Sequence, residues 1–190
     1  MKTIVLASSS PRRKEILEKT GLSFIVDPSN FEENLDQDLE PKELVKELSL
    51  GKAKDVTKRH KNAIVIAADS VVLLNGKVLG KPHTKEKAES MLSELSGSIH
   101  SAITGFTIID TDTGKTVSEA VETKIYFKKL TKEEIENYVE TGEPLDKAGA
   151  YAIQGKGGMF VEKIEGDYYN IVGLPLANLV EKLKEFGVTV

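Results

Sequence analysis

Two adjacent arginines, Arg12 and Arg13, stand near the start of the chain at a place where local rules disfavour them. They follow Ser10 and Pro11, which are typical of the cap and first position of a helix, and the apolar run 4–7 before these predicts a buried strand. The first turn of a helix disfavours each cation by about 0.3–1 kcal/mol, because the macrodipole is positive there. A bound anion resolves the conflict, since amides, serine hydroxyls and guanidinium groups then converge on a phosphate or polyphosphate. The alternative is an ordinary helix start with solvated basic side chains.

A carboxylate at Asp69 breaks a second rule, because it lies between the apolar runs 63–68 and 71–74. Burying a carboxylate there is costly unless it is paired, hydrogen-bonded or bound to a metal. The Asn-Gly dipeptide at 75–76 predicts a tight hairpin. The returning strand of that hairpin would carry Lys81 back into the neighbourhood of Asp69.

Two further candidates depend more on context. The acidic pair Glu32 and Glu33 follows a predicted strand over 22–26, and it could deliver one carboxylate to the same edge as the arginines. Lys52 lies beside the apolar stripe of a helix predicted from Pro41 to about residue 60. A lysine in that position usually packs its stem and keeps its ammonium in water, so position alone favours a structural role for Lys52.

The elements that must position these residues follow an α/β order. The first 26 residues predict a strand, a helix and a second strand, with the helix N-terminus beyond the end of the first strand, where α/β folds bind phosphates. Residues 146–158 are rich in small side chains, which suits tight turns or a close approach of backbone to a ligand. Later elements are a helix capped by Thr84, antiparallel strands over 100–109 and 117–128, a helix begun by the capping box of Thr131 and Glu134, and a last helix from Pro175.

Composition bounds the class of protein. The chain has 190 residues, 39% of them apolar, with a net charge of −4, which suits one domain or two small lobes and argues against a general nucleic-acid binder. The absence of cysteine excludes disulfides and thiolate chemistry. The first apolar run is too short for a signal peptide or a membrane span, so we expect a soluble cytoplasmic protein. The histidines show no metal-ligand spacing, and the common glycine-rich nucleotide-binding motifs do not occur.

The residues that break local rules together indicate metal-assisted phosphoryl chemistry. Serine, arginine and lysine side chains suit a polyphosphate, whereas carboxylates at strand ends suit Mg²⁺, which takes one or two carboxylates with water and phosphate oxygens. Such a set supports attack of water on a phosphoryl centre, with a carboxylate that orients or deprotonates the water. The candidates are Ser8, Ser10, Arg12, Arg13, one of Glu32 or Glu33, Asp69 and Lys81.

Several segments of the chain together resemble the Maf family. The serine–proline–double-arginine start and the Ala-Gly-x-Tyr-x-x-Gln-Gly segment make the resemblance specific, and it covers most of the chain. The matching segments are Leu6–Arg13, Glu32–Glu33, Lys52, Ala67–Asp69, Gly80–Pro82, Asp146–Gly155 and Asn170–Pro175.

The resemblance implies a nucleoside triphosphate pyrophosphatase that cleaves the α–β phosphoanhydride with Mg²⁺ or Mn²⁺. It also implies a single domain over residues 1–190, an elongated α/β fold of the Maf and ITPase-like kind, with a mixed twisted sheet flanked by helices and two lobes around a cleft. By position, Asp69 resembles the family's general base or metal-linked carboxylate. Glu33 matches the glutamate of the family's Asp-Glu pair, with Glu32 where an aspartate is common, so Glu33 and Asp69 are the expected metal ligands.

The remaining positions divide between phosphate and base. The resemblance turns two structural candidates, Lys52 and Gln154, into functional ones. Phosphate handling falls to Ser8, Ser10, Arg13, Lys52 and Lys81. The positions that mark a subgroup acting on dTTP, UTP and modified pyrimidine nucleotides are Arg12, Ser70 and Gln154.

Two other functions compete with this interpretation. A nucleotide-binding regulator of cell division without turnover is the main alternative, since the family has been linked to septum inhibition, but such a sensor has no need for Asp69. A nucleotidyltransferase also opens with a strand and an arginine-bearing phosphate loop, but Ser8–Ser10 stands where its glycine-rich loop belongs. We expect a nucleoside triphosphate as the partner, no nucleic acid and no membrane, with a homodimer as the default assembly.

Overall fold

The computed structural model describes residues 2–34 and 38–190 and shows a mixed α/β fold. Within these residues the strands form one seven-stranded sheet in the order β2-β1-β3-β5-β6-β7, with β4 paired to β3. The strands are β1 Thr3–Leu6, β2 Phe24–Val26, β3 Ala63–Leu74, β4 Lys77–Leu79, β5 Ile99–Asp110, β6 Thr116–Phe127 and β7 Val161–Glu165. The α-helices are α1 Pro11–Glu18, α2 Pro41–Thr57, α3 Lys85–Leu95, α4 Lys132–Glu140, α5 Tyr168–Val172 and α6 Leu176–Lys184, and the short 3₁₀ helices are η1 Glu143–Asp146, η2 Ala148–Ala150 and η3 Lys156–Phe160.

The chain divides into two compact units. The first comprises Met1–Asp69, Thr104–Val121 and Gly173–Val190, and the second comprises Ser70–Ile103 and Glu122–Val172. Strands β3, β5 and β6 each contribute residues to both units. No helix in the described part of the chain is long and apolar enough to cross a membrane.

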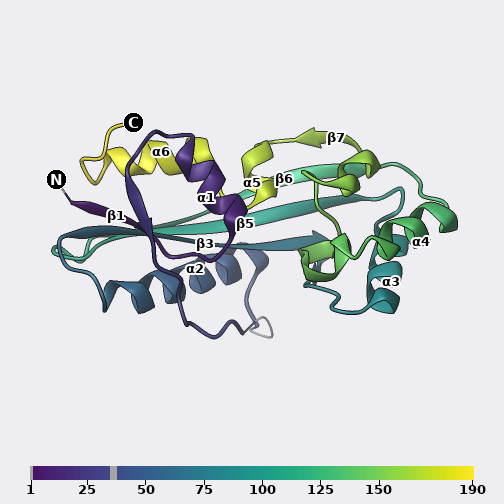
Figure 1. Cartoon of the computed structure of the whole chain (residues 1–190), viewed down its shortest axis with the longest axis horizontal. Coiled ribbons are helices and arrows are strands. Elements are labelled where there is room, and N and C mark those ends of the chain that lie inside the picture. The colour runs from purple at the N-terminus through teal and green to yellow at the C-terminus, as the bar shows by residue number, and fades with distance from the viewer. Residues whose placement is uncertain (1, 35–37) are drawn as a thin grey trace. The chain divides into compact units, whose positions relative to one another are not determined.

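The first unit begins with parallel strands, as the strand–helix–strand start of the chain predicts. Strand β1 pairs in parallel with both neighbours, so that Leu6 lies opposite Val26 of β2 and Ile66 of β3. Figure 1 shows α2 on one face of β1 and β3, and α1 and α6 on the other. On the α2 face a buried cluster joins alternate residues of the strands, including Val65 and Ala67 of β3, to α2 residues such as Ala53.

Local signals place the start of α1 where the sequence predicts it. Ser10 has an extended backbone and its hydroxyl accepts a hydrogen bond from the Arg13 amide at 3.5 Å, while Pro11 occupies the first helical position. Thr131 and Glu134 form the predicted capping box of α4. These two predictions are confirmed because a cap is decided by residues a few positions apart.

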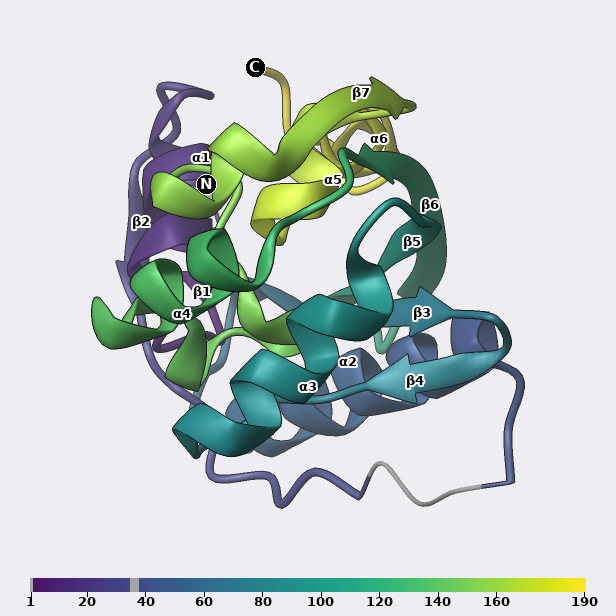
Figure 2. The same cartoon turned by 90° about the vertical axis from the view of Figure 1, so that its right-hand side faces the viewer.

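The second unit contains the predicted hairpin and a separate core. Strand β4 returns beside β3 (Figure 2), antiparallel to it and with Leu74 opposite Lys77. Both turn residues, Asn75 and Gly76, have positive φ, as a type I′ turn requires. Helices α3 and α4 contact each other and the η1 segment. Their core contains an aromatic group made of Phe127, Tyr138, Tyr151 and Phe160, in which the rings meet edge to face.

The structure differs from the sequence predictions in two places. Strand β3 runs without a break from Ala63 to Leu74, so Asp69 lies inside one strand instead of between two. The segment 159–175, for which the sequence predicts no regular structure, forms β7 and the short helix α5. The sequence of β7, Val-Glu-Lys-Ile-Glu, does not alternate apolar and polar residues, so its pattern does not predict a strand. The strand forms because it pairs with β6.

Candidate active site

A cluster of three charged side chains in the first unit joins two carboxylates to one lysine. The Lys52 ammonium donates to Oδ1 of Asp69 and lies 2.6 Å from Oε1 of Glu33. The side chains of Lys52 and Asp69 are only 11% and 8% exposed, whereas that of Glu33 is 47% exposed. A buried carboxylate is therefore paired, as the cost of its desolvation demands, and the cluster opens to solvent on the Glu33 side.

The position of Lys52 follows from the face of α2 that meets the sheet. Ala53 and Val56 of α2 pack on Val65 and Ala67 of β3, and side chains two residues apart share one face of a strand. Asp69 continues that face and meets Lys52, which precedes Ala53 on the helix. The Lys52 ammonium therefore lies against two carboxylates, whereas position alone predicts an ammonium in water.

Glu33 reaches the cluster through a loop that is docked on α2. The Asp55 carboxylate accepts hydrogen bonds from the Asn30 amide at 2.9 Å and the Ser29 hydroxyl at 3.1 Å. The ring of Phe31 lies over Gly51, where a Cβ would come within 2.4 Å of it. Of the two candidate glutamates, the structure brings Glu33 to Lys52.

Arg13 and Ser8 lie beyond the end of β1 in the same unit. The Arg13 guanidinium donates from Nε to the Gly173 carbonyl at 2.8 Å and from Nη1 to the buried Ser8 hydroxyl at 3.5 Å. Burial lowers the pKa of Arg13, and the negative charges of Asp69 and Glu33 oppose that shift. Arginine still stays charged at neutral pH, so Arg13 is a fixed cation beside the carboxylate cluster.

Ser10 and Arg12 complete the predicted set in this unit. The Ser10 hydroxyl caps α1 and its amide donates to the Ser8 hydroxyl at 3.2 Å, so the two serines are linked directly. Arg12 is half-buried on α1 next to Arg13. The serine segment and the first turn of α1 therefore form one connected group at the end of β1, which is where α/β folds bind phosphates.

Sequence reasoning missed Gly173, whose carbonyl orients Arg13. Gly173 is separated from Arg13 by 160 positions, so no local pattern links them. It falls inside the segment Asn170–Pro175, which resembles the Maf family but carries no other signal of function. Its φ of 129° is a value that few residues other than glycine adopt, which explains the residue type but does not reveal the contact.

The other predicted site residues, Ser70, Lys81 and Gln154, belong to the second unit. The β3–β4 pairing ends with Leu79 opposite Val72, so Ser70 and Lys81 both lie outside its paired part. Lys81 and Gln154 are both exposed. The segment that holds Lys81 is fixed by two main-chain hydrogen bonds of 3.1 Å, from the Gly149 amide to the Gly80 carbonyl and from the His83 amide to the Leu145 carbonyl.

The two carboxylates of the cluster fit a divalent cation that a phosphate ligand helps to hold. Among the residues described, no group of three or more His, Cys, Asp or Glu side chains could hold a metal ion. Glu33 and Asp69 both contact Lys52, so they lie close to each other. Mg²⁺ commonly takes one or two carboxylates and completes its shell with water and phosphate oxygens, and this pair meets that requirement.

Fold and cluster together define an α/β protein with a carboxylate–lysine pair and an arginine–serine pair in one unit. The chain belongs to the Maf family, because the family model described as "Maf-like protein" matches residues 3–186. The resemblance predicted from the sequence motifs is thereby confirmed.

Relatives cover the chain from end to end. A Methanosarcina mazei protein named dTTP/UTP pyrophosphatase is 50% identical over 100% of this chain and 97% of its own length. Proteins of the same name from Methanococcoides burtonii and Bacillus pumilus are 52% and 47% identical, each over 100% of this chain, and over 98% and 99% of their own lengths.

Solved structures support the fold alone. The Ham1 protein of Staphylococcus aureus matches with a TM-score of 0.55 at 18% identity, over 98% of this chain and 100% of that one. A HAM1 protein from Coxiella burnetii matches with a TM-score of 0.51 at 16% identity, over 97% of this chain and 100% of that one. The mixed α/β fold predicted from the sequence is confirmed.

Proposed function

We propose that this protein is a nucleoside triphosphate pyrophosphatase that converts dTTP and UTP, together with modified pyrimidine nucleotides, to the monophosphate and pyrophosphate. The observation that carries the proposal is the cluster of Asp69, Lys52 and Glu33 beside the cationic Arg13. It combines a carboxylate that can take a proton with fixed positive charge for phosphate. The names of relatives at about half identity over the full chain supply the substrates.

In this proposal Asp69 is the base that accepts the proton of the attacking water. Lys52 orients the Asp69 carboxylate through the hydrogen bond to Oδ1 and adds positive charge beside the phosphates. Arg13, Ser8 and Ser10 hold the triphosphate at the start of α1, where amides and the helix dipole also favour an anion. Because the Gly173 carbonyl fixes Nε of Arg13, the guanidinium is oriented before a nucleotide arrives.

Glu33 and Asp69 would hold the divalent cation, Mg²⁺ or Mn²⁺, that the family implies. When bound, such a cation neutralises charge on the phosphate oxygens during the reaction. The remaining protein contribution is positioning, since phosphoryl transfer depends mostly on placement and charge stabilisation.

The roles proposed for residues of the second unit are based on the family resemblance. Lys81 takes a phosphate-handling role. Ser70 and Gln154, together with Arg12, read the base. A glutamine suits a pyrimidine because its amide can both donate and accept a hydrogen bond at the base edge.

A nucleotide panel with product identification tests the proposal. The protein is incubated with dTTP, UTP, dATP or dGTP and with Mg²⁺ or Mn²⁺, and the products are separated. We expect pyrophosphate and the monophosphate from dTTP and UTP, and none without the cation. Release of orthophosphate and a diphosphate contradicts the proposal, whereas tight binding of nucleotide that stays intact establishes the non-catalytic regulator instead.

A further inference from the structure

We propose that Tyr138 and Glu143 form a clamp that positions Gln154 for base selection. The two side chains come from α4 and η1, and neither belongs to the residues assigned to the reaction. They are positioning residues, because they act on the main chain that carries Gln154. The inference rests on the proposed function, in which Gln154 reads the base.

The Glu143 carboxylate holds the main chain on one side of Gln154. Its Oε1 accepts a hydrogen bond from the Lys156 amide and its Oε2 accepts one from the Gly157 amide, both at 3.2 Å. Burial raises the pKa of Glu143, but the hydrogen bonds from the Tyr138 hydroxyl and the two amides outweigh this effect and lower it. The carboxylate is therefore charged at neutral pH and can accept both bonds.

The Tyr138 hydroxyl holds the main chain on the other side of Gln154. It accepts a hydrogen bond from the Ala152 amide at 3.1 Å and donates to the Glu143 carboxylate. Tyr138 is 4% exposed and its ring packs edge to face on that of Phe160, so the hydroxyl is held in place. The two side chains thus make one hydrogen-bonded unit that grips the chain before and after Gln154.

Between these anchors the chain forms a tight turn that presents Gln154. The Gly155 amide donates to the Ala152 carbonyl at 3.1 Å, which closes a turn with Gln154 at its third position. The Gln154 side chain is exposed while the chain on either side of it is fixed. Such an arrangement suits a side chain that contacts a ligand, because a main chain that is already ordered loses little entropy on binding.

Close contacts with the clamp explain why glycines stand near Gln154. A Cβ on Gly155 would lie 2.0 Å from Oε1 of Glu143, and one on Gly157 would lie 2.7 Å from the Tyr138 hydroxyl. Gly155 has a φ of −104°, which any residue can adopt, so close contact and not backbone conformation accounts for glycine there. The close approach expected from the small residues of this segment is therefore an approach to the clamp.

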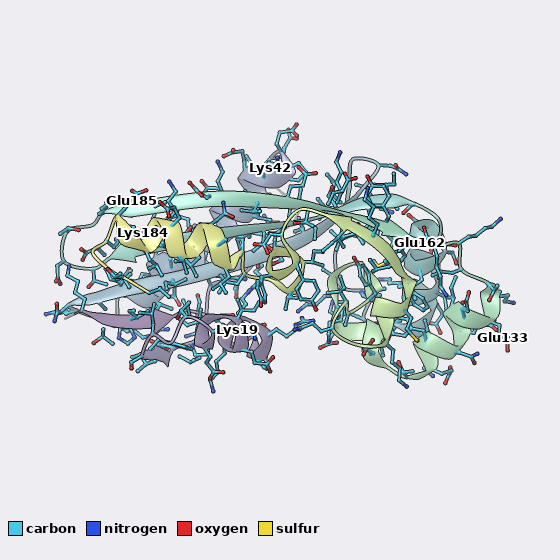
Figure 3. All side chains as sticks on the ribbon, turned by 90° about the horizontal axis from the view of Figure 1, so that it is seen from above. Lys19, Lys42, Glu133, Glu162, Lys184 and Glu185 are labelled. Atoms are coloured by element: carbon cyan, nitrogen blue, oxygen red, sulfur yellow. The ribbon has the colours of Figure 1, made fainter. Side chains whose placement is uncertain are left out.

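The test compares Glu143→Gln with Glu162→Gln, a matched change at an exposed glutamate of β7 (Figure 3). Glutamine keeps the shape of Glu143 but presents one oxygen to the two amides. For Glu143→Gln we expect KM for dTTP to rise about tenfold with kcat within about twofold, because uniform binding is lost. The preference for dTTP over dATP in kcat/KM should fall by a similar factor. Glu162→Gln should match the wild type in both.

Two more variants approach the clamp from other sides. Tyr138→Phe removes only the hydroxyl, and Gly155→Ala pushes the carboxylate away while leaving it charged. Both should lower the preference for dTTP in the same direction as Glu143→Gln. Faster hydrogen exchange at the amides of Lys156 and Gly157 should accompany the loss in the Glu143→Gln protein.

The outcomes separate this inference from the proposed function. A wild-type protein that releases no pyrophosphate from dTTP removes the proposed function, and base selection by the clamp with it. The clamp alone is overturned if the wild-type protein is active and the variants keep its dTTP-to-dATP preference while they lose only thermal stability. Should Glu143→Gln fail to fold, the Tyr138→Phe and Gly155→Ala proteins decide by the same ratio.

Discussion

Asp69 and Lys52 form a buried ion pair whose net contribution to stability is small. Desolvating two charges costs about as much as their attraction returns, so such pairs add little net stability. The half-exposed Glu33 shares the same ammonium, which leaves the three groups with one net negative charge. A site of this kind attracts cations, and Arg13 beside it attracts phosphate. The residues therefore suit a ligand that carries both a cation and a phosphate group.

Replacing Asp69 with asparagine tests its role as base. The amide oxygen of Asn can still accept from Lys52, so the fold should persist, but it cannot take a proton from water. We expect kcat for dTTP to fall by a factor of about 10² or more, in line with other acid–base groups. The measurement is pyrophosphate release at saturating dTTP, with Asp38→Asn, at an exposed aspartate, as the control. Near-normal turnover would remove Asp69 from the role.

The two adjacent arginines should differ in what they recognise. Arg13 is tied to Gly173 and Ser8 beside the carboxylate cluster, which suits a phosphate. In the proposed function, Arg12 contacts the base of the nucleotide. Arg12→Ala should change the dTTP-to-dATP preference by about tenfold, the effect of a hydrogen bond to a charged group, whereas Arg13→Ala should weaken all nucleotides alike. The check is kcat/KM for both nucleotides in each variant, and equal losses that ignore the base would defeat the division.

At the scale of elements, α2 brings the cluster together because it meets both the sheet and the loop that carries Glu33. Its inner face sets Lys52 against Asp69, and Phe31 and Asp55 dock the loop on the same helix. The loop can dock because residue 51 is a glycine, since any side chain there would displace the Phe31 ring. A helix interior glycine is otherwise unfavourable by about 1 kcal/mol relative to alanine.

We therefore expect Gly51→Ala to have opposite effects on helix propensity and on activity. Helix propensity favours the alanine, but its Cβ would come within 2.4 Å of the Phe31 ring and push the loop away. We expect kcat/KM for dTTP to fall by about 10²-fold as Glu33 is displaced, as small misplacements at a reacting centre do. Steady-state kinetics measures this, with Lys54→Ala on the exposed face of α2 as the control. Wild-type kcat/KM in the Gly51→Ala protein would show that the docking is unimportant.

The sequence predicts elements well where the signal is local. The Ser10 cap, the hairpin at Asn75 and the capping box at Thr131 each depend on residues a few positions apart, and all three are confirmed. The partners of Lys52 and Arg13 come from distant parts of the chain, so no pattern within a window reveals them. The functional role of Lys52 comes from the family resemblance, because amphipathic periodicity cannot tell a packed lysine from a paired one. The phosphate-binding role of Arg13 is predicted from its unfavourable place in the first turn of a helix.

At the scale of the whole molecule, charge and burial set how stability depends on pH. The carboxylates with the clearest shifts include Asp110, whose pKa the hydrogen bond from Lys2 lowers to about 2, and Asp27, whose pKa Arg59 and His60 lower. Groups of this kind contribute stability above their unfolded pKa and lose it only as pH falls below about 4. Between pH 7 and 5 they contribute a constant amount, so a different group must govern that range.

His100 is that group, and a single substitution should isolate it. It is 2% exposed, its Nε2 lies 2.9 Å from the Tyr151 hydroxyl, and burial lowers its pKa to about 4. Below about pH 6.5 His100 is protonated in the unfolded chain but remains neutral in the folded chain. The free energy of unfolding therefore decreases as pH falls toward 4. We expect a loss of roughly 2 kcal/mol between pH 7 and 5, measured by urea unfolding. His100→Gln should abolish that loss, and His83→Asn, at an exposed histidine, should retain it. The same pH dependence in the His100→Gln protein would assign the effect elsewhere.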